Sequence, residues 1–176
     1  MRIKWFIATL LLTGLILPAC TAAPKEFRST EGRFSVVAPI SFKEETQTLD
    51  TTVGKIEMHM FIAEGKDIAY AVAYSDYPEE MIRQSNPDQV LNGARDGMVS
   101  NVNGKLVLET KITLGKYPGR EVVVDLKLDN DIDGTVKSRM YLVENRMYQT
   151  QVITTKGAVS MQTISDFLDS FQLIGE

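Results

Sequence analysis

The sequence predicts an α+β domain, a twisted antiparallel β-sheet flanked by helices. Three observations predict it: several runs alternate apolar and polar residues, short turns join these runs, and two segments repeat apolar residues at the helical period. Turns of only a few residues between consecutive strands favour antiparallel pairing of those strands. Hydrophobic residues make up 44% of the 176 residues and charged residues 24%, which excludes a disordered or collagen-like chain.

Residues 1–19 carry the features of an export signal. Arg2 and Lys4 supply a positive start, residues 5–17 an apolar core, and Ala19 a small residue before the expected cleavage site. An apolar core of about 13 residues is about 20 Å long as a helix, too short for a hydrocarbon layer of about 30 Å. We therefore expect a cleaved signal peptide and a mature chain of 157 residues.

Residues 17–20 read Leu-Pro-Ala-Cys and resemble the lipobox of bacterial lipoproteins; Cys20 is the only cysteine of the chain. The resemblance implies diacylglyceryl transfer to the Cys20 thiol, cleavage before this residue, and acylation of the new amino group, with palmitate as the expected acyl chain. Two or more acyl chains give a stable membrane anchor. A plain secretory signal is the alternative. After lipidation no thiol is left for a disulfide, so core packing alone must stabilise the domain.

The expected location is the extracytoplasmic (periplasmic) face of the cell envelope. The residue after Cys20 is Thr21, not the Asp that favours retention in the inner membrane. In a host with an outer membrane we therefore expect the protein in that membrane, and in a cyanobacterium the thylakoid membrane is a further candidate. Residues 20–32 are expected to form the lipidated cysteine and a tether that reaches at most ~40 Å, followed by one domain over residues 33–174. This short reach favours a membrane-associated protein partner.

The charge of the mature chain argues against nucleic-acid binding. Removal of residues 1–19 leaves 17 basic and 23 acidic residues, a formal charge of −6. A mildly acidic domain without a basic stripe lacks the cations that neutralise phosphates.

The first half of the domain reads as strands followed by a helix. Residues 34–39 form a short apolar run that ends at Pro39 and predicts an edge strand, with residues 42–49 as its candidate partner. Two alternating runs follow, and residues 65–67 predict the hairpin turn between them. The expected strands are residues 34–39, 42–49, 53–64 and 69–75.

The segment after Asn86 changes to the helical period. Asn86 predicts an N-cap, Pro87 takes the first helical position, and Asp88 complements the positive end of the helix dipole. The apolar stripe consists of Val90, Leu91, Ala94 and Met98. Because glycine costs about 1 kcal/mol relative to alanine inside a helix, we expect Gly93 and Gly97 to serve close packing on a sheet.

Four more strand-like runs and a second helix follow. The strands are expected over residues 105–114, 120–128, 136–143 and 147–154, with residues 144–146 as a tight turn. The first of these runs is expected to bury Leu106, Leu108, Ile112 and Leu114. Ser160 predicts the N-cap of a helix whose apolar stripe is Met161, Ile164, Phe167, Leu168 and Phe171.

Four segments stand out: residues 32–39 (GRFSVVAP), 117–121 (YPGRE), 139–148 (RMYLVENRMY) and 167–171 (FLDSF). Together they resemble the PsbP-like superfamily, named after the extrinsic P-protein of photosystem II, and the resemblance spans about residues 33–173. It implies an α/β/α sandwich around an antiparallel sheet, acting as a non-enzymatic accessory or protein-binding module. The acidic and histidine contacts of the photosystem members have no position on this chain, so a photosystem role is not carried over.

The acidic loop, residues 129–134, is the most specific candidate for a ligand-binding motif in the sequence. Asp129, Asp131 and Asp133, followed by Gly134, match the first half of a calcium-binding loop. Met140 stands where the full motif needs a bidentate Glu, so any Ca²⁺ binding there is expected to be weak. The alternative is a solvated hairpin tip, and no other cofactor is expected.

A candidate copper site is the run Met58, His59 and Met60, since thioethers and imidazole suit Cu(I). On a regular strand, however, the two thioethers point to one face and the imidazole to the other, which favours core methionines and a surface histidine. No nucleophile–base pair, H-E-x-x-H, G-x-S-x-G or phosphate-binding glycine loop is present in the sequence. A non-catalytic domain is therefore expected.

The leading hypothesis is a membrane-anchored, non-catalytic lipoprotein that acts as a protein-binding or accessory module. Residues 77–80 and 117–119 place tyrosine beside proline in expected loops and are the candidates for partner contact. The alternative is a metal- or small-ligand-binding lipoprotein that uses the acidic loop.

Overall fold

The computed structural model describes residues 23–51 and 54–175, which form two antiparallel sheets and three α-helices. In spatial order the seven-stranded sheet consists of β3 (Lys43–Thr51), β4 (Gly54–Glu64), β5 (Ile68–Asp76), β9 (Arg146–Thr155), β8 (Asp133–Val143), β7 (Tyr117–Lys127) and β6 (Lys105–Leu114). The three-stranded sheet consists of β1 (Lys25–Ser29), β2 (Phe34–Ala38) and β10 (Gln172–Leu173). The helices are α1 (Glu79–Gln84), α2 (Pro87–Asn101) and α3 (Met161–Asp169), with a 3-10 turn at Asp129–Asp131.

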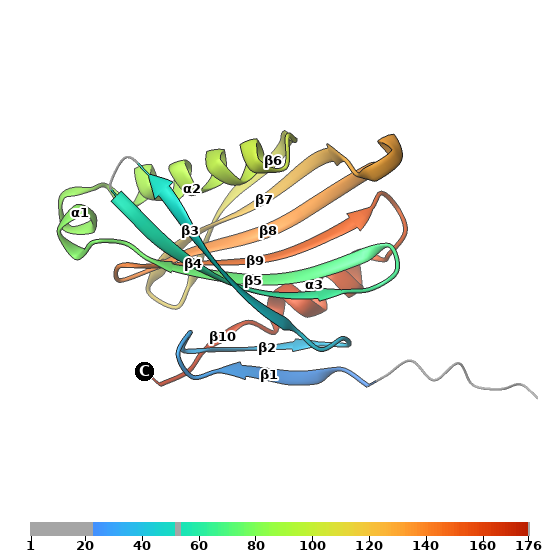
Figure 1. The fold of residues 1–176 in the computed structure, drawn as a ribbon, viewed down its shortest axis with the longest axis horizontal. Coiled ribbons are helices and arrows are strands. Elements are labelled where there is room, and N and C mark those ends of the chain that lie inside the picture. The colour runs from blue at the N-terminus through green and yellow to red at the C-terminus, as the bar shows by residue number, and fades with distance from the viewer. Residues whose placement is uncertain (1–22, 52–53, 176) are drawn as a thin grey trace, which may run out of the picture.

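The large sheet is the middle layer of the molecule. Figure 1 shows α2 above it and the small sheet with α3 below it. The lower core is rich in aromatic rings: Tyr70, Val72 and Tyr74 of β5 pack with phenylalanines of the small sheet and α3. The upper core is smaller, and Leu91 and Met98 of α2 pack there on valines of β7 and β8.

The expectation of a sheet flanked by helices, an α/β/α sandwich, is wrong. Strands dominate the described chain, and the layer opposite α2 is itself half sheet, made of β1, β2 and β10 beside α3. The cause lies in Phe27 of β1. Its ring lies 5.0 Å from that of Phe42 and 5.2 Å from that of Phe61, so a strand rather than a helix covers this part of the large sheet.

Strand β1 falls in residues that were expected to belong to the tether. Lys25–Ser29 pairs along its whole length with Phe34–Ala38, which makes β2 the central strand of its sheet rather than the expected edge strand. Strand β3, expected beside β2, pairs with β4 instead. The Tyr148 hydroxyl donates to the Gly32 carbonyl at 2.7 Å and holds the β1–β2 turn on the large sheet. Between Cys20 and β1 only residues 20–24 are left, an extended reach of roughly 18 Å.

Both expected helix caps are confirmed. The Asn86 side chain accepts a hydrogen bond from the Asp88 amide at 2.8 Å, and Ser160 accepts one from the Thr163 amide at 3.1 Å. Within the described residues, no helix is long and apolar enough to cross a membrane.

Two packing expectations are corrected. Leu108 is exposed, because a register shift between Leu106 and Leu108 in β6 turns it outward. Gly93 and Gly97 do not serve close packing on the sheet: a Cβ built on either would meet nothing within 4 Å.

Candidate functional site

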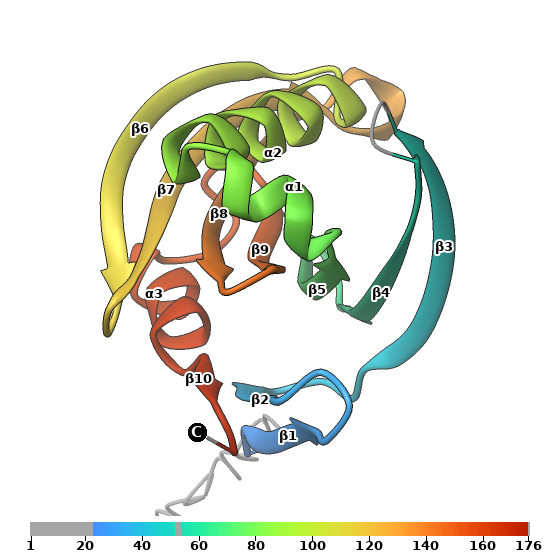
Figure 2. The ribbon, with the colours of Figure 1, turned by 90° about the vertical axis from the view of Figure 1, so that its left-hand side faces the viewer.

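An apolar groove lies beside α2, on the upper face of the large sheet. Helix α2 packs on β7 and β8, and Met147 and Ile153 of β9 join the same core, whereas the side chains of β4 and β5 on this face are only half-buried. In Figure 2, α2 lies toward β6 and β7, and β3 and β4 lie at the opposite edge. The resulting cavity has a volume of about 340 Å³, within the size range of small-molecule pockets.

The floor of this cavity is a row of alanines on β5. Ala69, Ala71 and Ala73 alternate with the buried Tyr70, Val72 and Tyr74, so the small side chains face α2 and the large ones face the lower core. A row of alanines between strands with longer side chains makes a trough that is one strand wide. We call this trough the β5 groove.

The two walls of the β5 groove differ in chemistry. On β4, Met60 pairs with Ala73 and Ile62 pairs with Ala71, and both side chains are half-buried. On β9 the partners of the same alanines are Gln149 and Gln151, whose amides bond to each other at 3.0 Å, and Ile153 continues this wall beside Ala69. The β4 wall is therefore aliphatic, whereas the β9 wall consists of two glutamines bonded to each other, followed by an isoleucine.

Helix α2 closes the third side with small residues in its middle and with the larger Met98, Asn101 and Val102 near its C-terminus. Gly93, Ala94 and Gly97 line the cavity, and both glycines lie on the exposed side of the helix. The glycines that the sequence singles out therefore widen the groove.

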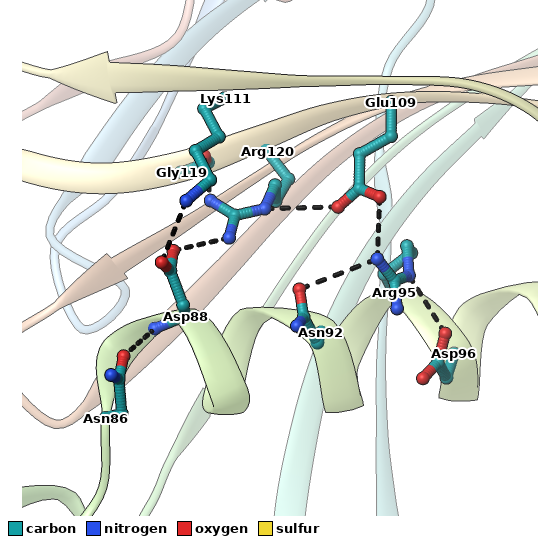
Figure 3. Close-up of polar contacts among 9 residues, drawn as sticks. All are labelled: Asn86, Asp88, Asn92, Arg95, Asp96, Glu109, Lys111, Gly119 and Arg120. Atoms are coloured by element: carbon teal, nitrogen blue, oxygen red, sulfur yellow. Dashed lines mark hydrogen bonds and ion pairs between the residues drawn. The ribbon is translucent and has the colours of Figure 1, made fainter.

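A network of ion pairs fixes α2 on its other side, away from the groove (Figure 3). The Arg120 side chain is only 4% exposed; it donates to Asp88 and, at 3.1 Å, to Glu109. Arg95 of α2 bonds to Glu109 at 2.6 Å, and Lys111 bonds to Asp88 at 2.8 Å. Hydrogen bonds from Arg120 and then Lys111 lower the pKa of Asp88 to about 2. This network ties the helix to β6 and β7.

The acidic loop lies at one end of the groove. A second, more open cavity of about 650 Å³ shares Ala69 and Ile153 with the groove, and Glu64, Asp67, Lys127 and Asp129 are among its lining residues. We call this second cavity the mouth of the groove. The apolar trough thus opens into a mouth of mixed polar and aliphatic lining, in which carboxylates outnumber cations.

Within the acidic loop, an ammonium group lies between the carboxylates proposed as metal ligands. Lys127 Nζ is 2.9 Å from Asp133 and 3.6 Å from Asp131, and its bond to Asp133 lowers the pKa of that carboxyl. Across residues 23–51 and 54–175, no three His, Cys, Asp or Glu side chains are grouped to hold a metal ion. Calcium binding by Asp129, Asp131 and Asp133 stays a prediction, and Lys127 competes for two of the three carboxylates.

His59 lies on the lower face of the sheet. Its ring stacks on Tyr74 at 4.6 Å, and its Nδ1 is 3.3 Å from the Thr46 hydroxyl, whereas Met58 and Met60 line the groove on the upper face. The structure therefore separates the imidazole from the two thioethers.

The expected partner-contact loops have different surroundings. Tyr77 lines the groove, and its backbone exchanges two hydrogen bonds of 2.9 Å with Asn145. Glu79 and Glu80 begin the short helix α1. Residues 117–119, by contrast, form the start of β7, with Tyr117 buried, so this segment is a strand rather than an open loop.

The expected lipidation site, Cys20, lies outside the described residues. Sequence reasoning found the glycines, the methionines and the acidic loop, but it missed the groove that joins them. The alternation of alanine with tyrosine and valine along residues 69–74 was the available signal.

Comparison with known proteins identifies the fold. The sequence matches no family model and no curated protein. Among solved structures, the chain is similar to cyanobacterial PsbP (CyanoP) from Synechocystis, with a TM-score of 0.59 and 9% identity over 92% of this chain and 98% of that one. A protein from Bacteroides thetaiotaomicron has a TM-score of 0.48 and 14% identity, and the match covers 86% of this chain and 49% of that one. At such identities the likeness concerns the fold alone, and the chain has the PsbP-like fold.

Proposed function

We propose that this protein is a non-catalytic binding domain, held by a lipidated Cys20 at the extracytoplasmic face of a bacterial membrane, and that the β5 groove is its binding site. The observation that carries the proposal is the uncovered apolar surface of β4 and β5 beside α2. Methionine, isoleucine and alanine side chains there are only half-buried although a helix lies directly beside them. Recessed apolar surface of this kind is typical of ligand and partner sites.

The polar side chains interact with other groups of the protein, which supports a binding role over a catalytic one. His59 stacks on Tyr74 and contacts Thr46, and the buried Arg120 is paired with two carboxylates. His59 thereby links β4 to β3 and β5, and Arg120 holds α2. A nucleophile or general base needs a free position beside a substrate pocket, and the groove offers thioethers, methyl groups and amides instead.

The position of β1 indicates how the anchored domain would be oriented on the membrane. Strand β1 lies on the side of the large sheet opposite α2 (Figure 1), and residues 20–24 precede it. A lipid anchor at Cys20 would hold the layer of β1, β2 and α3 next to the bilayer, within roughly 18 Å. The β5 groove would then face away from the membrane that carries the anchor, toward soluble ligands and the projecting parts of membrane proteins.

The test places a photocrosslinking amino acid in the groove of the full-length protein in its native membrane. Position Tyr77 lines the groove, and Ser100, on the exposed side of α2, is the matched control outside it. We expect a defined crosslinked product from position 77, none from position 100, and loss of membrane attachment in Cys20→Ser. Equal labelling from both positions, or none from position 77, would contradict the groove as the binding site.

A further inference from the structure

We propose that the β5 groove binds the unbranched aliphatic chain of a single-chain amphiphile, whose head group lies in the mouth beside the acidic loop. The inference deepens the proposed function and rests on its claim that the groove is a binding site. It adds a ligand class, an orientation of the ligand, and a preference for the charge of the head group.

The shape of the groove selects an extended chain. Neighbouring strands are about 4.8 Å apart, so the backbones of β4 and β9 stand about 10 Å apart across the alanines of β5. Along β5 the floor runs from Ala69 to Ala73, about 14 Å at strand rise. An extended chain advances about 1.2 Å per bond, the spacing of extended backbone geometry, so this length takes about twelve bonds. A helix with its side chains is about 10–12 Å across, too wide for the space between the wall side chains.

The lining suits hydrocarbon over most of its length. Met58 and Met60 are unbranched and adaptable, so they can close around a chain without a fixed complementary shape. The Gln151 amide donates to the Gln149 carbonyl oxygen at 3.0 Å, so part of the polar surface of this wall is already paired within the protein. The open space next to Gly93 and Gly97 leaves the helix side free for the chain to enter.

The mouth determines the orientation of the amphiphile. Ala69 and Ile153 belong to both cavities, so a chain on the alanine floor leads directly to Glu64, Asp67 and Asp129. The nearby ammonium of Lys127 is already bonded to Asp133. The field at the mouth is therefore negative, and a cationic head group is favoured there over an anionic one of equal chain length.

The protein's own expected anchor does not fill this site. In the proposed arrangement the acyl chains at Cys20 lie in the bilayer, and β1, from which the anchor extends, lies on the side of the large sheet opposite the groove (Figure 1). The occupant of the groove is therefore a separate molecule.

Titration calorimetry tests the inference with the mature chain from residue 20, carrying Cys20→Ser so that the anchor does not associate with the ligand. The probes are alkyltrimethylammonium ions of 8, 10, 12 and 14 carbons and the matching carboxylates, all below their micelle concentrations. We expect one site, an affinity that rises roughly four-fold per methylene, and a plateau once the chain exceeds the groove. The ammonium should bind roughly three- to ten-fold more tightly than the carboxylate.

Two leucine variants on α2 separate the groove from general detergent binding. Gly97→Leu places a side chain into open space in the groove and should weaken binding by at least roughly ten-fold while the fold is kept. Ser100→Leu adds the same side chain at an exposed position of α2 that does not line the groove, and it should leave binding unchanged. Glu64→Gln combined with Asp67→Asn should reduce the preference for the ammonium probe.

Affinity without dependence on chain length, or equal binding by Gly97→Leu and the wild type, would overturn the amphiphile as occupant. If crosslinking from position 77 still yields a specific product in that case, the groove is a binding site for another class of molecule and the proposed function stands. If both experiments fail, the groove is not a binding site.

Discussion

The two faces of the seven-stranded sheet are covered to different extents. On the lower face, the small sheet and α3 bury a continuous aromatic core that includes Phe34, Phe61 and Phe171. On the upper face, α2 covers β7 and β8, and the groove-lining side chains of β4 and β5 are only half-buried. The lower face supplies stability, which lets the upper face keep apolar surface available for binding.

The largest expected effect comes from removal of a central ring of the lower core. Phe34 is 0% exposed, and its ring lies 5.4 Å from that of Phe61 and 5.7 Å from that of Phe171. Phe34→Ala should lower the free energy of unfolding by about 3–5 kcal/mol, because it removes the buried ring and leaves a cavity. The half-buried Met60 of the groove is the matched site, and Met60→Ala should cost about 1 kcal/mol. Urea denaturation followed by circular dichroism measures both, and equal losses would refute the contrast between the faces.

A smaller effect is expected from the network that holds α2 in place. Arg120→Met removes the cation shared by Asp88 and Glu109. Because both carboxylates are partly exposed, water solvates them in the variant, and the free energy of unfolding should fall by only about 2 kcal/mol. The exposed pair of Arg83 and Glu80 provides the control, and Arg83→Ala should change stability by less than about 0.5 kcal/mol. If Arg120→Met is as mild as the control, the network does not position the helix.

The same network predicts a pH dependence below pH 4. Bonds from Arg120 and Lys111 lower the pKa of Asp88 to about 2, so the folded state keeps this carboxyl ionised where the unfolded chain protonates it. Its stabilising contribution is fully present above the ordinary pKa of about 3.8 and is lost as the pH falls toward 2. Asp88→Asn should therefore make the urea midpoint fall less steeply between pH 4 and pH 2. An unchanged slope would show that Asp88 titrates normally in the folded protein.

The smallest expected effect is a gain in stability at the edge of the groove. Gly93→Ala and Gly97→Ala place a methyl group where no atom lies within 4 Å and reduce the freedom of the unfolded chain. Each should raise the free energy of unfolding by about 0.5–1 kcal/mol. A loss of stability, read from thermal unfolding, would mean that α2 packs against the sheet at these positions.

The sequence predicted local features better than the arrangement of the layers. Asn86 and Ser160 were recognised as helix caps because a cap depends on a few neighbouring residues. Strand β1 was missed because Lys25–Ser29 is polar at four of its five positions, and Phe27 gains its burial from rings far along the chain. Long-range pairing of this kind leaves little trace in a local pattern.

The candidate site was visible in parts. The methionine pair, the two helix glycines and the acidic loop all stood out in the sequence, and each received a separate interpretation. Their meeting along β5 depends on the register of β4, β5 and β9 and on the position of α2. Ion pairs between residues more than ten positions apart set that position, so the groove follows from tertiary structure.

The most direct test of the groove as a binding site is an NMR titration of the ¹³C-labelled methionine methyl groups with dodecyltrimethylammonium below its micelle concentration. Met58 and Met60 lie in the groove, whereas Met161, which is 63% exposed on α3, reports nonspecific detergent contact. The predicted result is saturable shifts of Met58 and Met60 while Met161 stays unchanged. Equal shifts at Met161, or no shift at Met58 and Met60, would contradict the assignment of the β5 groove as the site where this protein binds an amphiphile.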